Sequence, residues 1–64
     1  MDIIDRLIQE RRLKHITQVE LASELSITQS TLWRYETKQR DISLDLALKY
    51  AEYVGLEFKL LLKE

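Results

Sequence analysis

The sequence predicts an all-α protein, a compact bundle of four to five short helices. Its 64 residues include no proline and a single glycine, Gly55, so the residues that most often interrupt helices are nearly absent. Apolar residues recur at helical spacing over most of the chain. Three hydroxyl residues, Thr17, Thr28 and Ser43, stand where a side-chain oxygen caps the start of a helix.

The length predicts a single domain over residues 1–64. A core of this size is marginal by itself, and the chain has no cysteine for disulfide bonds. Helix packing or a second subunit must therefore provide stability. We expect a cytoplasmic protein without membrane attachment, because no apolar run reaches the roughly 18–20 residues of a membrane span and the first residues do not resemble a signal peptide.

The first helix is expected over residues 2–14. Asp2 and Asp5 lie near its N-terminal end, where negative charge is favourable. Ile4, Leu7, Ile8 and Arg11 fall at helical spacing along it, although the basic group Arg11, Arg12 and Lys14 is expected mainly to solvate this helix.

The second and third helices are expected to follow closely. Thr17 and Glu20 have the spacing of a capping box, in which each side chain bonds to the backbone amide of the other residue. A break at residues 26–27 separates this helix from the third, which Thr28 caps and which runs to about Glu36. The second helix is predicted to bury Leu21, Ala22 and Leu25.

The fourth helix is expected from Leu44 to about Val54, capped by Ser43 and followed by Gly55 at a position that favours glycine. Its buried face is predicted to comprise Leu44, Ala47, Leu48, Ala51 and Val54. Its less buried side is predicted to carry Leu46, Tyr50 and Tyr53. These three residues are either a subunit face or incidental exposed apolar groups.

In the tail, residues 56–63, the spacing of the apolar residues is no longer helical. Apolar and charged residues alternate as in a β-strand, with Leu61 as the exception. A single strand is not stable alone, so this interpretation requires pairing with the same strand of a second copy across a homodimer. The alternative is a short fifth helix that docks Leu60 and Leu61 on the core. The dimerisation residues under the first interpretation are Leu46, Tyr53, Phe58, Leu60 and Leu62.

The third helix has two different sides. Leu32 and Tyr35 are predicted to face inward, toward the second helix. The outward side is predicted to carry Gln29, Ser30, Trp33, Arg34 and Thr37. Amide, hydroxyl and guanidinium groups are those that read base edges in the major groove of DNA. Trp33 either lies against a thymine methyl group or a sugar, or folds back as part of the core.

Two short helices joined by a turn of three to four residues are typical of a helix-turn-helix, and residues 17–36 fit this pattern. Residues 17–32, TQVELASELSITQSTL, closely resemble the phage repressor/Cro-type, or XRE, helix-turn-helix family. The resemblance extends through Glu36 and more loosely to Leu56. It implies a lambda-repressor-like bundle that binds palindromic double-stranded DNA as a homodimer.

The resemblance also implies individual roles. Gln18 would contact a phosphate and brace Gln29, which would read a base, typically adenine. Ser30 would contact the neighbouring base, and Arg34 would reach a base or a phosphate. The remaining roles fall to Lys38 and Arg40, which would contact the DNA backbone, and to Arg11 and Glu36, which would form a structural ion pair.

Three positions depart from the family pattern, because His15, Ser26 and Lys38 stand where glycine is common. The resemblance places Ser26 in the turn, where a positive φ would cost a non-glycine residue about 1 kcal/mol.

Other functions lack supporting residues. His15 is the only histidine and there is no cysteine, so neither a metal site nor a cofactor is expected. No base stands in a pattern that would activate a nucleophile, so we do not expect an enzyme. The sequence favours a repressor-like regulator. Two alternatives stay open: an autoregulating antitoxin with a toxin protein as partner, since the tail resembles that of antitoxins with a cross-dimer strand, and a protein-interaction module, since the net charge is −1.

Overall fold

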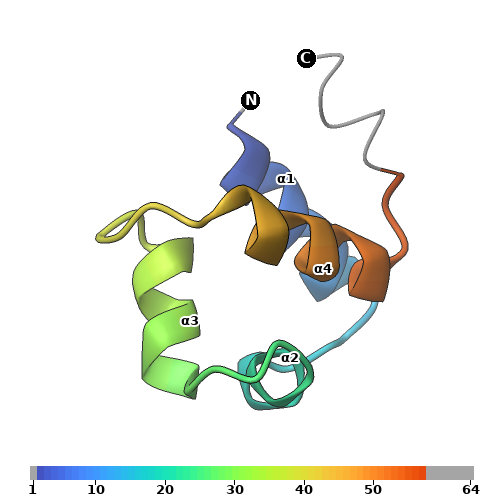
Figure 1. Ribbon diagram of the computed structural model, residues 1–64. Helices are drawn as coiled ribbons and strands as arrows, with labels where there is room; N and C mark the ends of the chain where they lie inside the picture. Colours follow the sequence, from blue (N-terminus) through green and yellow to red (C-terminus); the bar gives the residue numbers. More distant parts are fainter. Residues whose placement is uncertain (1, 58–64) are drawn as a thin grey trace.

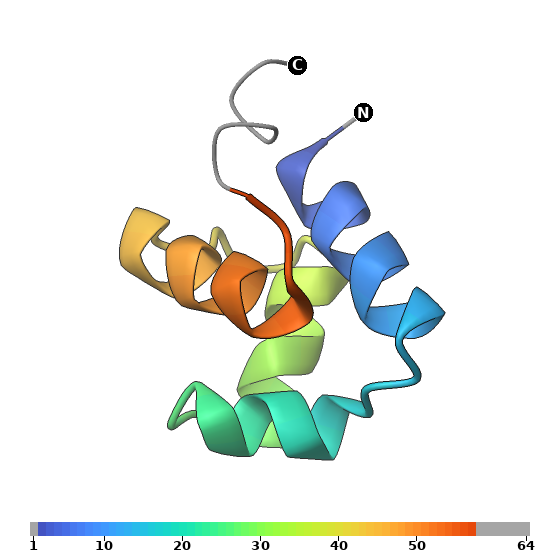
Figure 2. The ribbon, with the colours of Figure 1, turned by 90° about the vertical axis from the view of Figure 1, so that its right-hand side faces the viewer.

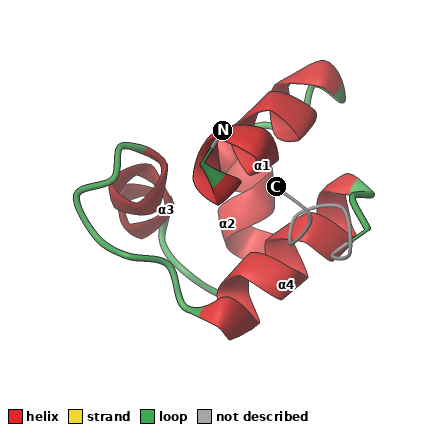
Figure 3. Cartoon of the chain, turned by 90° about the horizontal axis from the view of Figure 1, so that it is seen from above, coloured by secondary structure: helices red, strands yellow, loops and turns green. Residues whose placement is uncertain are grey.

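The protein is all-helical, as the sequence predicts. A computed structural model describes residues 2–57, in which four helices follow one another. These are α1 (Ile3–Leu13), α2 (Gln18–Glu24), α3 (Gln29–Glu36) and α4 (Leu44–Val54) (Figure 1). Within residues 2–57 only helices and loops are present (Figure 3). The predictions for Phe58, Leu60 and Leu62, and with them the choice between a strand and a fifth helix, lie outside the described residues.

Each helix begins with a side-chain cap. Thr17, Thr28 and Ser43 accept hydrogen bonds from the backbone amide three residues on, as predicted. Asp2 caps α1 by accepting from the Ile4 amide, two residues on. The Glu20 carboxylate, predicted to complete a capping box, accepts a hydrogen bond from the Tyr53 hydroxyl of α4. The sequence therefore fixes where the helices start through local hydrogen bonds.

Each helix also ends in the same way, in a left-handed residue. In each case the amide of this residue bonds three residues back and the next amide bonds five residues back, the Schellman pattern. The four residues and their φ angles are His15 (57°), Ser26 (58°), Lys38 (64°) and Gly55 (82°). The positive φ expected at Ser26 is thus confirmed, and three of the four helix ends use a residue with a side chain.

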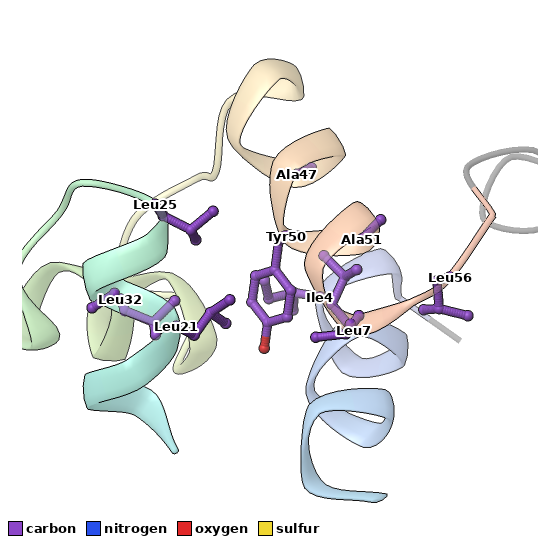
Figure 4. Packing of buried hydrophobic residues seen from close by; sticks show 11 residues of the cluster. Ile4, Leu7, Leu21, Leu25, Leu32, Ala47, Tyr50, Ala51 and Leu56 are labelled. Atoms are coloured by element: carbon purple, nitrogen blue, oxygen red, sulfur yellow. The ribbon is translucent and has the colours of Figure 1, made fainter. Parts of the chain in front are cut away.

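The core lies between two pairs of helices. α4 packs on α1, while α2 packs on α3 (Figure 2). Figure 4 shows the Tyr50 ring between Leu21 of α2 and Leu7 of α1, with its hydroxyl pointing past them. The core residues are Ile4, Leu7, Leu21, Ala22, Leu25, Leu32, Ala47, Tyr50, Ala51, Val54 and Leu56.

The predicted orientation of α4 was partly wrong. Tyr50 is fully buried rather than on the less buried side, and Leu44 is 64% exposed rather than in the core. Apolar residues surround most of α4, so its sequence alone leaves the buried face open. Packing against α1 and α2 selects the side of Ala47, Ala51 and Val54, and Tyr50 lies within that stripe.

The helix pair α2 and α3 lies at the end of the molecule opposite the start of α1 (Figures 1 and 2). The chain from Leu25 to Thr28 forms the short turn between them. This arrangement buries one side of α3 and leaves its other side open at the surface.

Candidate nucleic-acid interface

The two sides of α3 match the predicted division. Leu32 is fully buried and Tyr35 is 8% exposed, so both belong to the inner side. The outer side is exposed at Gln29, Ser30, Trp33, Arg34 and the C-cap Thr37. Trp33 is 47% exposed, so its indole lies at the surface rather than in the core. The outer side therefore presents amide, hydroxyl and guanidinium groups, which can read base edges, together with an exposed indole.

The start of α3 is locally ordered by hydroxyl groups. Thr28 Oγ1 accepts from the Thr31 amide at 3.1 Å and lies 3.2 Å from Ser30 Oγ. Because these hydrogen bonds order the first turn of α3, the backbone that carries the exposed Gln29 and Ser30 side chains has a fixed position. The free amides of such a helix start also favour a negatively charged ligand.

The structure brings Gln18 and Gln29 together. Gln29 Nε2 donates to Gln18 Oε1 at 3.4 Å, across the turn between α2 and α3. Gln18 Nε2 donates in turn to Glu36 Oε1 at 3.0 Å. An exposed residue at the tip of α3 is thus linked to a buried carboxylate at the other end of the same helix.

Arg11 and Glu36 form a bidentate ion pair between α1 and α3. Nε and Nη2 of Arg11 each donate to a different Glu36 oxygen at 2.9 Å, and Nη1 donates to the Ile16 carbonyl at 2.9 Å. Both residues are buried, at 7% and 9% exposure. Burial lowers the pKa of Arg11, but the hydrogen bonds and charge of Glu36 outweigh it and raise the pKa overall. The pair therefore ties α3 to α1 with both charges retained.

Tyr50 joins this pair, which the sequence reasoning missed. Its hydroxyl donates to Glu36 Oε2 at 2.6 Å, and burial, followed by the Glu36 charge, raises the pKa of Tyr50 well above its usual range. A polar residue in the 47, 50, 51, 54 stripe of α4 is a signal that could have found it, since a buried hydroxyl needs a partner. Arg11, Gln18 and Tyr50 together surround Glu36 from three helices.

Lys38 and Arg40, predicted to contact the DNA backbone, have partners within the chain. Lys38 Nζ lies 3.1 Å from Asp5 Oδ2 and 3.3 Å from Asp2 Oδ2 of α1. The hydrogen bonds to Asp5 and Asp2 raise the pKa of Lys38. The Arg40 guanidinium lies 5.9 Å from the centre of the Tyr35 ring. Both cations are exposed, and such surface pairs exchange readily for other partners.

The two described residues among the five predicted dimerisation residues, Leu46 and Tyr53, differ from each other. Leu46 is half-buried against the core, whereas Tyr53 is 37% exposed. The hydrogen bond from the Tyr53 hydroxyl to Glu20 raises the pKa of Tyr53 to about 12. Tyr53 therefore connects α4 to α2 within one chain and still exposes part of its ring.

Within residues 2–57, no group of three His, Cys, Asp or Glu side chains is placed to hold a metal ion. None of the four described helices combines the length and apolar character needed to cross a membrane.

Comparison with known proteins gives one result. A family described as helix-turn-helix matches residues 7–61, which include all of the site described above except the start of α1. The comparison with curated proteins finds no match, and neither does the comparison with solved structures. The chain belongs to the helix-turn-helix family of the phage repressor/Cro, or XRE, type, whose members are DNA-binding regulators.

Proposed function

We propose that the protein is a sequence-specific transcriptional regulator that inserts α3 into the major groove of its operator. The observation that carries this proposal is the open outer side of α3, with Gln29 hydrogen-bonded to Gln18 at its tip. Gln29 and Ser30 read adjacent bases, and Arg34 reaches a base or a phosphate one turn further along. Trp33, half exposed beside them, lies against a thymine methyl group or a sugar.

The phosphate contacts come from groups beside α3. Gln18 stands at the start of α2, where free amides and the helix dipole favour an anion. Lys38 and Arg40 follow the end of α3 and reach the backbone on the other side. These contacts set position and orientation on the duplex, while the α3 contacts set base preference.

We further propose that two copies bind a palindromic operator as a repressor. Two recognition helices of a dimer enter successive major grooves about 34 Å apart. The exposed part of Tyr53 and the neighbouring Leu46 on α4 supply the described part of the subunit face. The core of a 64-residue domain is small, so a second subunit adds substantially to its stability.

In vitro selection of bound DNA, together with a mass measurement of the oligomer, tests this proposal. The expected result is a palindromic motif and a dimer mass. Gln29→Ala should relax the preference at one base position in each half-site. An unchanged motif for Gln29→Ala would contradict the base-reading role. Absence of any salt-dependent DNA binding would instead support a protein-interaction module.

A further inference from the structure

The ammonium group of Lys38 lies between two carboxylates at the start of α1. Its Nζ is 3.1 Å from Asp5 Oδ2 and 3.3 Å from Asp2 Oδ2, and all three side chains are about half exposed. Lys38 follows the end of α3 in the left-handed conformation, at φ 64°. This contact therefore joins the first turn of α1 to a residue that the proposed function places on a DNA phosphate.

The Asp2 carboxylate has a second role that holds it in place. Its Oδ1 accepts the hydrogen bond from the Ile4 amide at 3.0 Å that caps α1, while its Oδ2 faces Lys38. If Asp2 turned away, the start of the helix would lose its side-chain acceptor. Asp5 lies in the first turn of the same helix. The negative charge beside Lys38 is thus part of how α1 begins.

A DNA phosphate and the two aspartates compete for the same ammonium group. A phosphate that approaches Lys38 Nζ in its present position also approaches two carboxylates, and like charges repel. If the Lys38 side chain turns toward the phosphate instead, both of its ion pairs are lost. In either case, part of the free energy gained from the phosphate contact is offset within the protein.

We propose that Asp2 and Asp5 are affinity-determining residues, which lower the affinity of the protein for DNA by competing with phosphate for Lys38. This inference rests on the proposed function. Arg40 provides the contrast, because the partner that the structure shows for it is the Tyr35 ring, 5.9 Å from the guanidinium. That ring has no net charge that would repel a phosphate. Of the two proposed backbone contacts, only the one made by Lys38 is opposed in this way.

The competition acts equally on all DNA sequences. Phosphate contacts set the position of a protein on the duplex and carry no base information. The acidic pair therefore weakens binding to the operator and to unrelated DNA by the same factor. Base preference remains a property of the residues on the outer side of α3.

A double-mutant cycle measured as DNA affinity tests this inference. Asp2→Asn combined with Asp5→Asn removes both charges, and asparagine caps a helix as well as aspartate does. Fluorescence anisotropy gives the affinity for the selected operator of the native protein, of this double variant, of Lys38→Met and of the triple variant. We expect the double variant to bind several-fold more tightly, as two exposed ion pairs allow, and most of this gain to be lost without Lys38.

Two controls separate competition from general charge. Glu24→Gln combined with Glu52→Gln also removes two exposed negative charges, on α2 and α4, and its effect should be the same with and without Lys38. Arg40→Met should weaken binding by the same factor in the native chain and in the Asp2→Asn, Asp5→Asn variant. Far-UV circular dichroism checks that each variant is folded before its affinity is measured.

Each outcome decides the matter. If the gain from the two asparagine substitutions is as large in Lys38→Met as in the native chain, the aspartates act only through general charge and the inference is overturned. No gain in either background overturns it as well. If the native protein binds no duplex in a salt-dependent manner, the proposed function fails and this inference fails with it.

Discussion

Single residues matter most where charge is buried, and Glu36 is the clearest case. Its carboxylate accepts bonds from Arg11, Gln18 and Tyr50, which come from three different helices. None of the buried side-chain nitrogen or oxygen atoms among residues 2–57 lacks a hydrogen-bond partner. A fully satisfied polar cluster of this kind is sensitive to the loss of any one member, because the others are then left buried without compensation.

Arg11→Met should therefore be strongly destabilising. The substitution leaves the Glu36 charge buried without its counterion, which costs about 3–5 kcal/mol in comparable pairs. Domains of this length have a total stability of only roughly 3–10 kcal/mol. Urea denaturation would measure the loss. The neighbouring Arg12→Met is the control, since Arg12 is exposed and should change stability by no more than about 0.5 kcal/mol. Equal midpoints for the two variants would contradict a stabilising role for the pair.

At the scale of elements, the four helices share one construction, with a side-chain cap at the start and a left-handed residue at the end. The starts use residues that are favourable there. Three of the ends do not, because His15, Ser26 and Lys38 carry a Cβ in a region that glycine prefers. The left-handed conformation at these three helix ends is locally unfavourable, so the free energy gained when the helices pack must exceed this cost.

Ser26→Gly should be neutral or stabilising, by up to about 1 kcal/mol. Glycine relieves the strain of φ 58° at the turn, although it also makes the unfolded chain more flexible. Thermal unfolding measures the change. Ser23→Gly is the matched control, because Ser23 lies within α2, where glycine costs about 1 kcal/mol. A clear fall in the Tm of Ser26→Gly would show that the turn needs its serine.

Gly55→Ala should have the opposite effect and destabilise the protein. Alanine would have to adopt the backbone φ of 82° that Gly55 has. Its Cβ would also lie 2.7 Å from Lys14 Nζ, which donates to the Val54 carbonyl at the end of α4. The left-handed conformation alone costs alanine about 1–2 kcal/mol. Comparing the substitution in the native chain and in Lys14→Ala, by urea denaturation, separates the two causes. A smaller loss in the Lys14→Ala background is expected, and an unchanged urea midpoint in the native chain would contradict the prediction.

At the scale of the whole molecule, the distribution of charge matters more than its sum. The net charge is −1, so the protein has no general attraction for nucleic acid. Arg34, Lys38 and Arg40 lie on or just after α3, while the acidic Glu20, Glu24 and Glu52 lie on α2 and α4. DNA binding in the proposed mode therefore depends on a few local cations.

Arg40→Ala should weaken binding to all sequences alike. Arg40 is proposed to contact phosphate, so its loss should leave the selected motif unchanged and reduce the slope of log affinity against log salt by about 1 per site. Fluorescence anisotropy titrations at several salt concentrations would measure both quantities. Lys49→Ala, an exposed cation on α4, is the control and should leave the slope unchanged. A changed motif for Arg40→Ala would reassign Arg40 to base reading.

Much of the fold follows from short-range chemistry that a sequence displays. The caps at Thr17, Thr28 and Ser43, the left-handed turn at Ser26 and the two sides of α3 depend on residues within about four positions of one another. Local hydrogen bonds and helical period determine such features. The sequence by itself was therefore sufficient to predict the helices, their order and the helix-turn-helix, while the positive φ at Ser26 was expected from the family resemblance.

Only the tertiary structure decided which side of α4 is buried and which partners Tyr50 and Lys38 have. Tyr50 meets Glu36 across 14 positions of sequence, and Lys38 meets Asp5 across 33. Apolar residues around most of α4 allow several faces to be buried equally well in isolation. The buried face is determined when α1 and α2 pack on one stripe of α4 and the buried Tyr50 hydroxyl donates to Glu36. The reason is that the free energy of burial depends on the whole packed arrangement rather than on any one segment.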